Sequence, residues 1–269
     1  MTTPAQGLFT ASLPELYERY LVAPLFRPFA GSLLRHAGLT PRDRLLDVAC
    51  GTGVVLRVAR ETLGESAPVV GVDASPAMLA VARATTPAID WREGDAAHLP
   101  VGAGETFDLV TCHQGVQFFK DKPAAAREMR RVLAPGGRVA LATWRAAREL
   151  PLMRDLQQVV ERHVGPVFDV RHGFGDAGEM RQLLADAGFA EVRVEAVTRT
   201  IRIADPTVFP RLNAMALVGM SEAGKTMTEA QRAEVVAAIA DECAGVVGCY
   251  VDGGDLVFDL ATNVGIGQA

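Results

Sequence analysis

Short apolar runs alternate along the chain with amphipathic segments of about ten residues between Arg44 and Thr143. The apolar runs predict strands, and the segments between them predict helices. Strands are expected at residues 44–49, 68–72, 88–92, 107–112 and 138–143. Helices are expected at residues 54–63, from 76 onward, and from 121 to the turn at 135–137. This alternation predicts an α/β fold in which a parallel sheet is covered on both faces.

Several helix ends carry recognisable signals. Ser75 precedes a proline, which suits an N-cap followed by the first helical position. Asp176 is expected to begin a later helix that stops at Gly188. Thr228 and Gln231 have the spacing of a capping box. These signals place further helices outside the alternating region.

The flanking segments do not fit the alternation. Residues 13–37 are typical of two helices, and residues 190–197 and 255–261 of two strands that form an edge hairpin. Long insertions that carry apolar periodicity are expected to fold, here as a helical cap that closes over a pocket. The expected segments are 1–40 (cap helices), 41–145 (cofactor-binding core), 146–175 (cap), 176–199 (core helix and strand), 200–254 (cap) and 255–269 (final core strand).

Composition narrows the function classes. The chain has 27 basic and 32 acidic residues, which gives a net charge of −5, and the sequence shows no basic stripe. Both observations argue against nucleic acid as a binding partner. No uncharged apolar run has the length of a membrane span, and Met1–Thr10 is too short and broken to be a leader. The four cysteines form no Cys-x-x-Cys pair, so no metal site is expected. We therefore expect a cytoplasmic protein.

The strongest chemical signal is a strand that runs into a glycine turn, Leu45–Gly53, and then a helix. In open α/β sheets the ligand binds beyond the carboxyl ends of the strands, where this turn lies. A dinucleotide-binding loop would have a third glycine where this chain has Leu56. Asp47 would repel a pyrophosphate but attract an ammonium group. The turn therefore suits the methionine part of S-adenosylmethionine.

Two more carboxylates follow neighbouring strands. Asp73 ends the second strand, where a carboxylate can accept both hydroxyls of a ribose. Asp95 follows the third strand, where it can accept the amino group of adenine. Ala74 and Met78 are placed to line the faces of the adenine ring. The three carboxylates together favour a nucleoside attached to an amino acid.

The order of motifs carries a family resemblance over residues 44–144. The motifs are LLDVACGTG, GVDAS, EGDAAHLP, FDLVTCHQGVQFF and REMRRVLAPGGRVALATW. In this order they resemble the class I S-adenosylmethionine-dependent methyltransferases, and most of all the branch similar to ubiquinone and menaquinone methyltransferases. The resemblance implies a Rossmann-like, seven-stranded, mostly parallel sheet with an antiparallel edge hairpin.

The resemblance also implies roles for single residues. Asp47 and Gly51 would flank the methionine moiety, Asp73 would bind the ribose, and Asp95 the adenine. The full cofactor-binding set is Tyr20, Asp47, Ala49, Gly51, Asp73, Ala74, Met78, Asp95, Ala96 and Cys112. His113 would lie near the methyl group, where it is a candidate general base or substrate contact; the alternative is a hydrogen-bonded core histidine.

The expected function is methyl transfer from S-adenosylmethionine to a small, largely apolar molecule. Apolar residues such as Phe209, Leu212 and Met215 in the cap favour a hydrophobic acceptor. The acceptor atom, O, N or C, stays open, and so does a homodimer. Two alternatives are a protein of the same fold that catalyses a cyclisation, and, with less support, a nicotinamide-dependent oxidoreductase.

Overall fold

The computed structural model describes residues 12–269. Met1–Thr10, the segment considered as a leader, lies outside the described residues, as does the first part of the expected 1–40 segment. The chain divides into two compact units. Unit 1 comprises the chain up to Trp144 with Asp176–Val197 and Thr262–Ala269, and unit 2 comprises Arg145–Gly175 and Thr198–Ala261.

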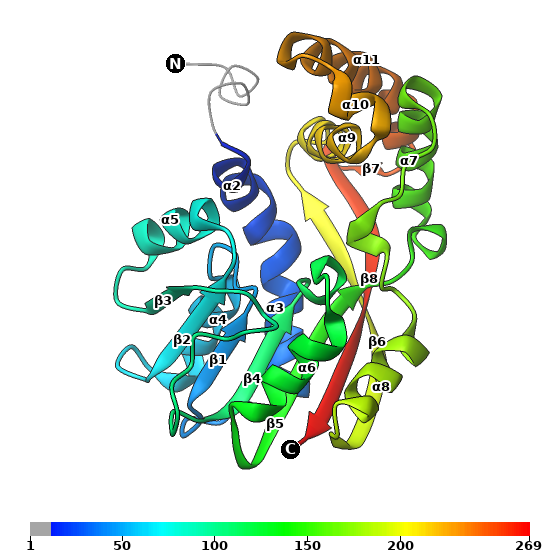
Figure 1. The fold of residues 1–269 in the computed structure, drawn as a ribbon. Coiled ribbons are helices and arrows are strands. Elements are labelled where there is room, and N and C mark those ends of the chain that lie inside the picture. The colour runs from blue at the N-terminus through cyan, green and yellow to red at the C-terminus, as the bar shows by residue number, and fades with distance from the viewer. Residues whose placement is uncertain (1–11) are drawn as a thin grey trace. The chain divides into compact units, whose positions relative to one another are not determined.

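The strands of the described residues form a single sheet (Figure 1). They are β1 Leu45–Val48, β2 Val69–Asp73, β3 Asp90–Glu93, β4 Phe107–His113, β5 Leu133–Trp144, β6 Ala190–Ile203, β7 Val251–Asp252 and β8 Asp255–Gln268. Their order is β3-β2-β1-β4-β5-β8-β6. The first five pair in parallel, and β8 is antiparallel to β5. The mostly parallel sheet with an antiparallel edge is therefore confirmed.

The strand count of seven was wrong, because within residues 12–269 the sheet has eight strands. The additional strand is the two-residue β7, which pairs with the start of β8. Two residues are too few to show the alternation of apolar and polar positions that marks a strand. The seven longer strands form the continuous path.

The helices follow the caps that the sequence carries. They are α2 Leu13–Leu16, η1 Tyr17–Phe26 (a π-helix), α3 Arg27–His36, α4 Val54–Leu63, α5 Pro76–Thr85, η2 Val116–Phe118, α6 Lys122–Arg131, η3 Ala147–Glu149, α7 Pro151–Val164, η4 Val170–His172, α8 Ala177–Asp186, α9 Val208–Met220, α10 Glu222–Thr226 and α11 Glu229–Gly248. Ser75 accepts from the Met78 N–H, and Asp176 from the Gly178 and Glu179 N–H groups. The Thr228–Gln231 capping box is present. These predictions are confirmed.

Strand β8 is longer than the expected 255–261 because Gly265 and Gly267 continue it. A Cβ added at Gly265 would lie 2.5 Å from Met180 Sδ, and one at Gly267 would lie 2.8 Å from Phe189 Cβ. The two glycines thus let Met180 of α8 and Phe189, which lies between α8 and β6, pack directly on the strand. From sequence, closely spaced glycines suggest a break instead.

The main core of unit 1 lies between the sheet and helices α3, α4 and α5. Leu33, Leu56 and Leu79 contribute one side chain from each of these helices, and all three are fully buried. Helices α6 and α8 contact each other on the other face (Figure 1). In unit 2, α7, α9 and α11 pack against one another. No helix among residues 12–269 combines the length and apolar character that crossing a bilayer requires.

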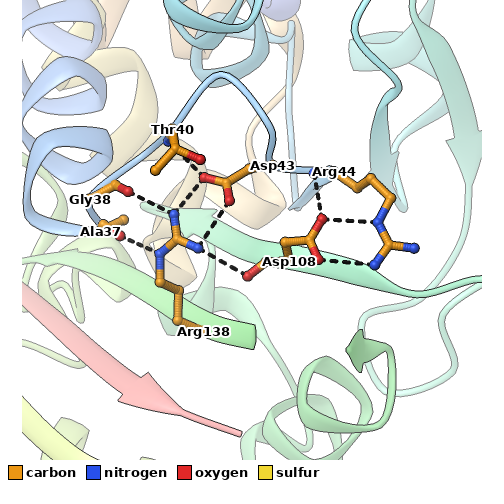
Figure 2. A network of polar contacts seen from close by, with 7 residues as sticks. All are labelled: Ala37, Gly38, Thr40, Asp43, Arg44, Asp108 and Arg138. Carbon is orange, nitrogen blue, oxygen red and sulfur yellow. Dashed lines mark hydrogen bonds and ion pairs between the residues drawn. The ribbon is translucent and has the colours of Figure 1, made fainter. Parts of the chain in front are cut away.

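A half-buried arginine, Arg138 on β5, connects the end of α3 to the sheet (Figure 2). The Arg138 guanidinium, on β5, donates to the carbonyls of Ala37 and Gly38 just after α3 and forms an ion pair with Asp43. Arg138 also donates to the carbonyl of Asp108 on β4 at 3.2 Å. This cluster lies near the amino ends of β1 and β4 and connects the segment that follows α3 to the sheet.

Candidate cofactor-binding site

The predicted site residues of the sheet meet where β1, β2 and β4 end, because these strands are neighbours and parallel. Asp47 on β1 is in register with Gly71 on β2 and with Thr111 on β4. Asp73 is the last residue of β2, and His113 is the last residue of β4. The carboxyl ends of the strands thus carry the groups that the sequence singled out, as the topology of open α/β sheets requires.

The glycine turn bends back on itself through left-handed backbone conformations. The φ angles are 55° at Ala49, 55° at Gly51 and 89° at Gly53. A Cβ at Gly53 would overlap the Trp91 ring, so this glycine is needed for packing. A Cβ at Gly51 would meet no atom within 4 Å. Gly51 therefore presents bare backbone to open space, which suits close approach by a ligand.

Asp73 connects the end of β2 to this turn. Its Oδ2 accepts from the Gly51 N–H at 2.8 Å, and its Oδ1 accepts from the Ser75 N–H at 2.8 Å. Burial raises the pKa of Asp73, while the two N–H donors act in the opposite direction. Each carboxylate oxygen has a second lone pair free for another donor. The geometry is compatible with the predicted ribose contact and adds a second role, that of holding the turn.

Asp47 is the most deeply buried carboxyl group of the site, with 1% of its surface exposed. Its Oδ1 accepts from Thr111 Oγ1 at 2.7 Å, while its Oδ2 has no hydrogen-bond partner among the described residues. Burial raises its pKa to about 8, opposed by the Thr111 bond and aided by the charge of Asp73. A buried oxygen without a donor is costly, so this atom is fitted to receive one. An ammonium group supplies both the donors and the positive charge.

Helix η1, which belongs to unit 1, carries two tyrosines, Tyr17 and Tyr20. The predicted site residue Tyr20 has a buried hydroxyl without a partner in residues 12–269, and the Arg19 guanidinium lies 5.2 Å from its ring centre. Tyr17, which the sequence analysis missed, packs its ring 4.7 Å from that of Phe26. Burial raises the pKa of Tyr17, and Glu18, Asp47 and Asp73 raise it further. The three-residue spacing of Tyr17 and Tyr20 on a helix was the available signal.

His113 is buried at the end of β4 with 7% of its surface exposed. Its ring stands edge-on to Phe26, with the centres 6.1 Å apart, and its Nε2 has no partner among the described residues. Burial lowers the pKa of His113 to about 3. The ring is therefore neutral near pH 7, which makes it a weak proton acceptor but leaves it able to form a hydrogen bond.

Gln114 follows His113 in a left-handed conformation with φ of 59°. Its Nε2 donates to Thr262 Oγ1 at 3.1 Å, and its Oε1 is buried and lacks a partner in the part of the chain that the structure describes. Left-handed backbone is uncommon for a residue with a side chain and tends to occur at functional sites. The sequence analysis included Gln114 only as part of the motif FDLVTCHQGVQFF.

The remaining predicted residues lie in different surroundings. Asp95 is exposed, and its Oδ1 accepts from the Ala97 N–H at 2.7 Å. Ala74 is exposed, Met78 is half-buried and Ala96 is buried. Cys112 is fully buried in the interior of the sheet. Asp95 belongs to the same end of the sheet as Asp47 and Asp73 because β3, β2 and β1 are neighbouring strands.

Comparison with known proteins places the chain among methyltransferases. A family model described as a methyltransferase domain matches residues 46–141. The 2-phytyl-1,4-naphtoquinone methyltransferase of Synechococcus elongatus is 33% identical over 171 residues, which cover 60% of this chain and 72% of that protein. The nocamycin O-methyltransferase of Saccharothrix syringae is 34% identical over 191 residues, covering 62% and 66%.

A solved structure shares the fold. The phosphoethanolamine N-methyltransferase 2 of Haemonchus contortus, in complex with phosphomonomethylethanolamine and S-adenosylhomocysteine, gives a TM-score of 0.58 at 18% identity. The match covers 98% of this chain and 58% of that one. None of these comparisons favours the cyclisation or the oxidoreductase that the sequence left as alternatives. The chain belongs to the class I methyltransferases that use S-adenosylmethionine, in the branch similar to the quinone methyltransferases.

Proposed function

We propose that the methionine part of the cofactor binds at the glycine turn, with its ammonium group on Asp47 Oδ2. This placement rests on one observation: Asp47 Oδ2 is buried and accepts no hydrogen bond from any group among residues 12–269. Gly51 supports it, because its backbone faces open space beside the same strand end. Asp73 would accept the ribose hydroxyls while holding the Gly51 N–H, and Asp95 would accept the adenine amino group.

S-adenosylmethionine supplies a methyl group on a sulfonium, which is already an activated leaving group. The protein therefore needs mainly to align the acceptor and exclude water. His113 and Gln114 follow directly on β4 and offer unpaired polar atoms for this purpose. With a pKa of about 3, His113 would orient the acceptor through a hydrogen bond rather than remove its proton.

The acceptor we propose is a small, largely apolar molecule with a ring that bears a hydroxyl group, as in a reduced quinone. The names of the relatives, naphthoquinone and nocamycin methyltransferases, support an apolar acceptor.

The closing of unit 2 over the methyl donor stays a prediction from the sequence. Cytoplasmic location, the absence of nucleic acid as a substrate, and a homodimer are further proposals. Free cysteines support the first, and the net charge of −5 supports the second.

Asp73→Ala tests the site. Loss of a charged acceptor for the ribose should weaken binding of S-adenosylhomocysteine by about ten- to a hundredfold. Isothermal titration would measure this, with circular dichroism to show that the variant is folded. A folded variant with unchanged affinity would place the ribose elsewhere.

A separate assay addresses the acceptor. The enzyme would be incubated with S-adenosylmethionine and an alkylated 1,4-naphthohydroquinone, and the release of S-adenosylhomocysteine followed by mass spectrometry. A polar catechol and the di-O-methylated hydroquinone serve as comparison compounds. We expect turnover with the apolar hydroquinone alone. Turnover that prefers the polar catechol would rule out the proposed acceptor class.

A further inference from the structure

Arg57 joins two parts of unit 1 that are far apart in the sequence. Its Nη1 donates to the carbonyl oxygen of Thr52 at 2.5 Å. Its Nη2 donates to both carboxylate oxygens of Glu18, at 2.8 and 3.1 Å. Thr52 belongs to the glycine turn, and Glu18 belongs to helix η1. One guanidinium group on α4 therefore bridges the turn and the N-terminal helix.

Glu18 lies on the same helix, η1, as the two tyrosines at the N-terminal side of the turn. Glu18 lies between Tyr17, whose hydroxyl is buried in the field of Asp47 and Asp73, and Tyr20, whose buried hydroxyl lacks a partner among the described residues. If Glu18 moves, the backbone that carries both tyrosines moves with it. The bridge thus connects the turn with the aromatic groups on its N-terminal side.

A second ion pair also joins α4 to an N-terminal helix, in this case α3, and no residue of the glycine turn takes part in it. Arg27 on α3 pairs with Glu61 on α4. Their side chains are 49% and 57% exposed, whereas those of Arg57 and Glu18 are 17% and 24% exposed. Exposed pairs are screened by solvent and contribute little, and partly buried pairs contribute more. The Arg27–Glu61 pair is therefore a built-in control for the Arg57–Glu18 pair.

We propose that Arg57 is a positioning residue that couples cofactor binding in the glycine turn to the docking of helix η1. A ligand that fixes the turn also fixes the Thr52 carbonyl, and through Arg57 it favours the docked position of Glu18 and the two tyrosines. Such coupling is reciprocal, so docking of η1 raises cofactor affinity by the same factor. The inference rests on the proposed placement of the cofactor's methionine part at the turn.

The test compares Arg57→Met, Glu18→Ala, their double variant and the control Arg27→Met. Binding of S-adenosylhomocysteine is measured by titration calorimetry, and backbone hydrogen exchange of residues 13–26 is measured with and without saturating ligand. We expect each of the first two variants to bind about tenfold more weakly. The double variant should be no weaker than the Arg57→Met variant, because both changes break one bridge. The control should bind within about twofold of the wild type.

Two results separate positioning from a general loss of stability. In the wild type, ligand should slow exchange in residues 13–26, and this gain should shrink in the Arg57→Met and Glu18→Ala variants but not in the control. Arg57→Lys should recover part of the affinity, since an ammonium group keeps the charge but not the two-sided geometry. If Arg57→Met does not fold, Glu18→Ala, which leaves the turn contact in place, decides the question.

The proposal is overturned if Glu18→Ala binds ligand like the wild type, or if the control weakens binding as much as Arg57→Met. Additive effects in the double variant would also overturn it. A wild-type protein that does not bind S-adenosylhomocysteine would instead refute the proposed site itself, so the two failures are distinguishable.

Discussion

Ala49 occupies a left-handed position in the glycine turn, with φ of 55°. That conformation costs a residue with a Cβ about 1 kcal/mol or more, and glycine adopts it without strain. We predict that Ala49→Gly raises the free energy of unfolding by up to about 1 kcal/mol. Urea denaturation measures this change.

Ala80 provides the comparison for that substitution, because it is exposed in the interior of helix α5. There, glycine should lower the free energy of unfolding by about 0.5–1 kcal/mol. If both substitutions destabilise the protein equally, the backbone at Ala49 carries no strain.

Asp47 gives the protein a pH dependence whose sign can be worked out. Burial raises its pKa from 3.8 to about 8, so between these values the folded state binds a proton that the unfolded state has released. The free energy of unfolding should therefore fall as pH rises through this window. Asp47→Asn removes the titration, so the variant should gain stability relative to the wild type as pH rises between these two pKa values. Thermal melts of the ligand-free proteins at several pH values measure this difference. If the free energy of unfolding of the variant minus that of the wild type stays constant or falls as pH rises, the raised pKa is contradicted.

The single residues that sequence predicted best are those whose position follows from topology. Asp47 is the penultimate residue of β1 and Asp73 the last residue of the parallel strand β2, so their meeting near the glycine turn could be inferred from the order of strands and helices alone. Thr111 and Arg57 could not be inferred in this way. Their partners, Asp47 and Glu18, are 64 and 39 positions away, and such contacts depend on side-chain packing that no local pattern records.

Among the elements, the C-terminal end of α3 is connected to the sheet by Arg138. The side chain of Arg138 is 16% exposed and its partner Asp43 is 8% exposed. Arg138→Met would leave the Ala37 and Gly38 carbonyls without this donor, and Asp43 with the Thr40 N–H but without its ion-pair partner. We predict a loss of about 2–4 kcal/mol in the free energy of unfolding, measured by urea denaturation.

Arg44 is a suitable control for this change because it belongs to the same cluster in Figure 2. It pairs with Asp108, but its side chain is 44% exposed. Arg44→Met should cost no more than about 1 kcal/mol. Equal losses for the two variants would mean that burial does not distinguish the two ion pairs.

Local patterns predicted the elements of the alternating region well and those outside it less well. The helix at Val54–Leu63 was predicted to the residue, because its apolar face and flanking glycines are unambiguous. The π-helical form of η1 was not predicted, since its side-chain pattern does not differ from that of an α-helix. The length of β8 was underestimated because glycines that serve packing on α8 resemble glycines that end a strand.

At the scale of the whole molecule, all predicted cofactor-binding residues belong to unit 1. Binding of S-adenosylhomocysteine should therefore slow hydrogen exchange most in unit 1, above all at the glycine turn between Cys50 and Gly53. Helix α11 of unit 2 should change less. Exchange mass spectrometry on the free and bound protein measures both. Protection that is larger in α11 than in the turn would contradict the placement of the cofactor.

Strands β6 and β8 each have residues in both units: β6 is divided between Val197 and Thr198, and β8 between Ala261 and Thr262. Two of the four boundaries of unit 2 are therefore mid-strand seams, whereas the other two, after Trp144 and after Gly175, lie outside strands. Exchange of residues 198–261 between related enzymes would have to preserve the alternation of side chains across both seams, since a slip of one position turns every later side chain to the opposite face. Divergence of this segment among related enzymes should accordingly proceed by substitution, with insertions and deletions confined to the connections between its helices.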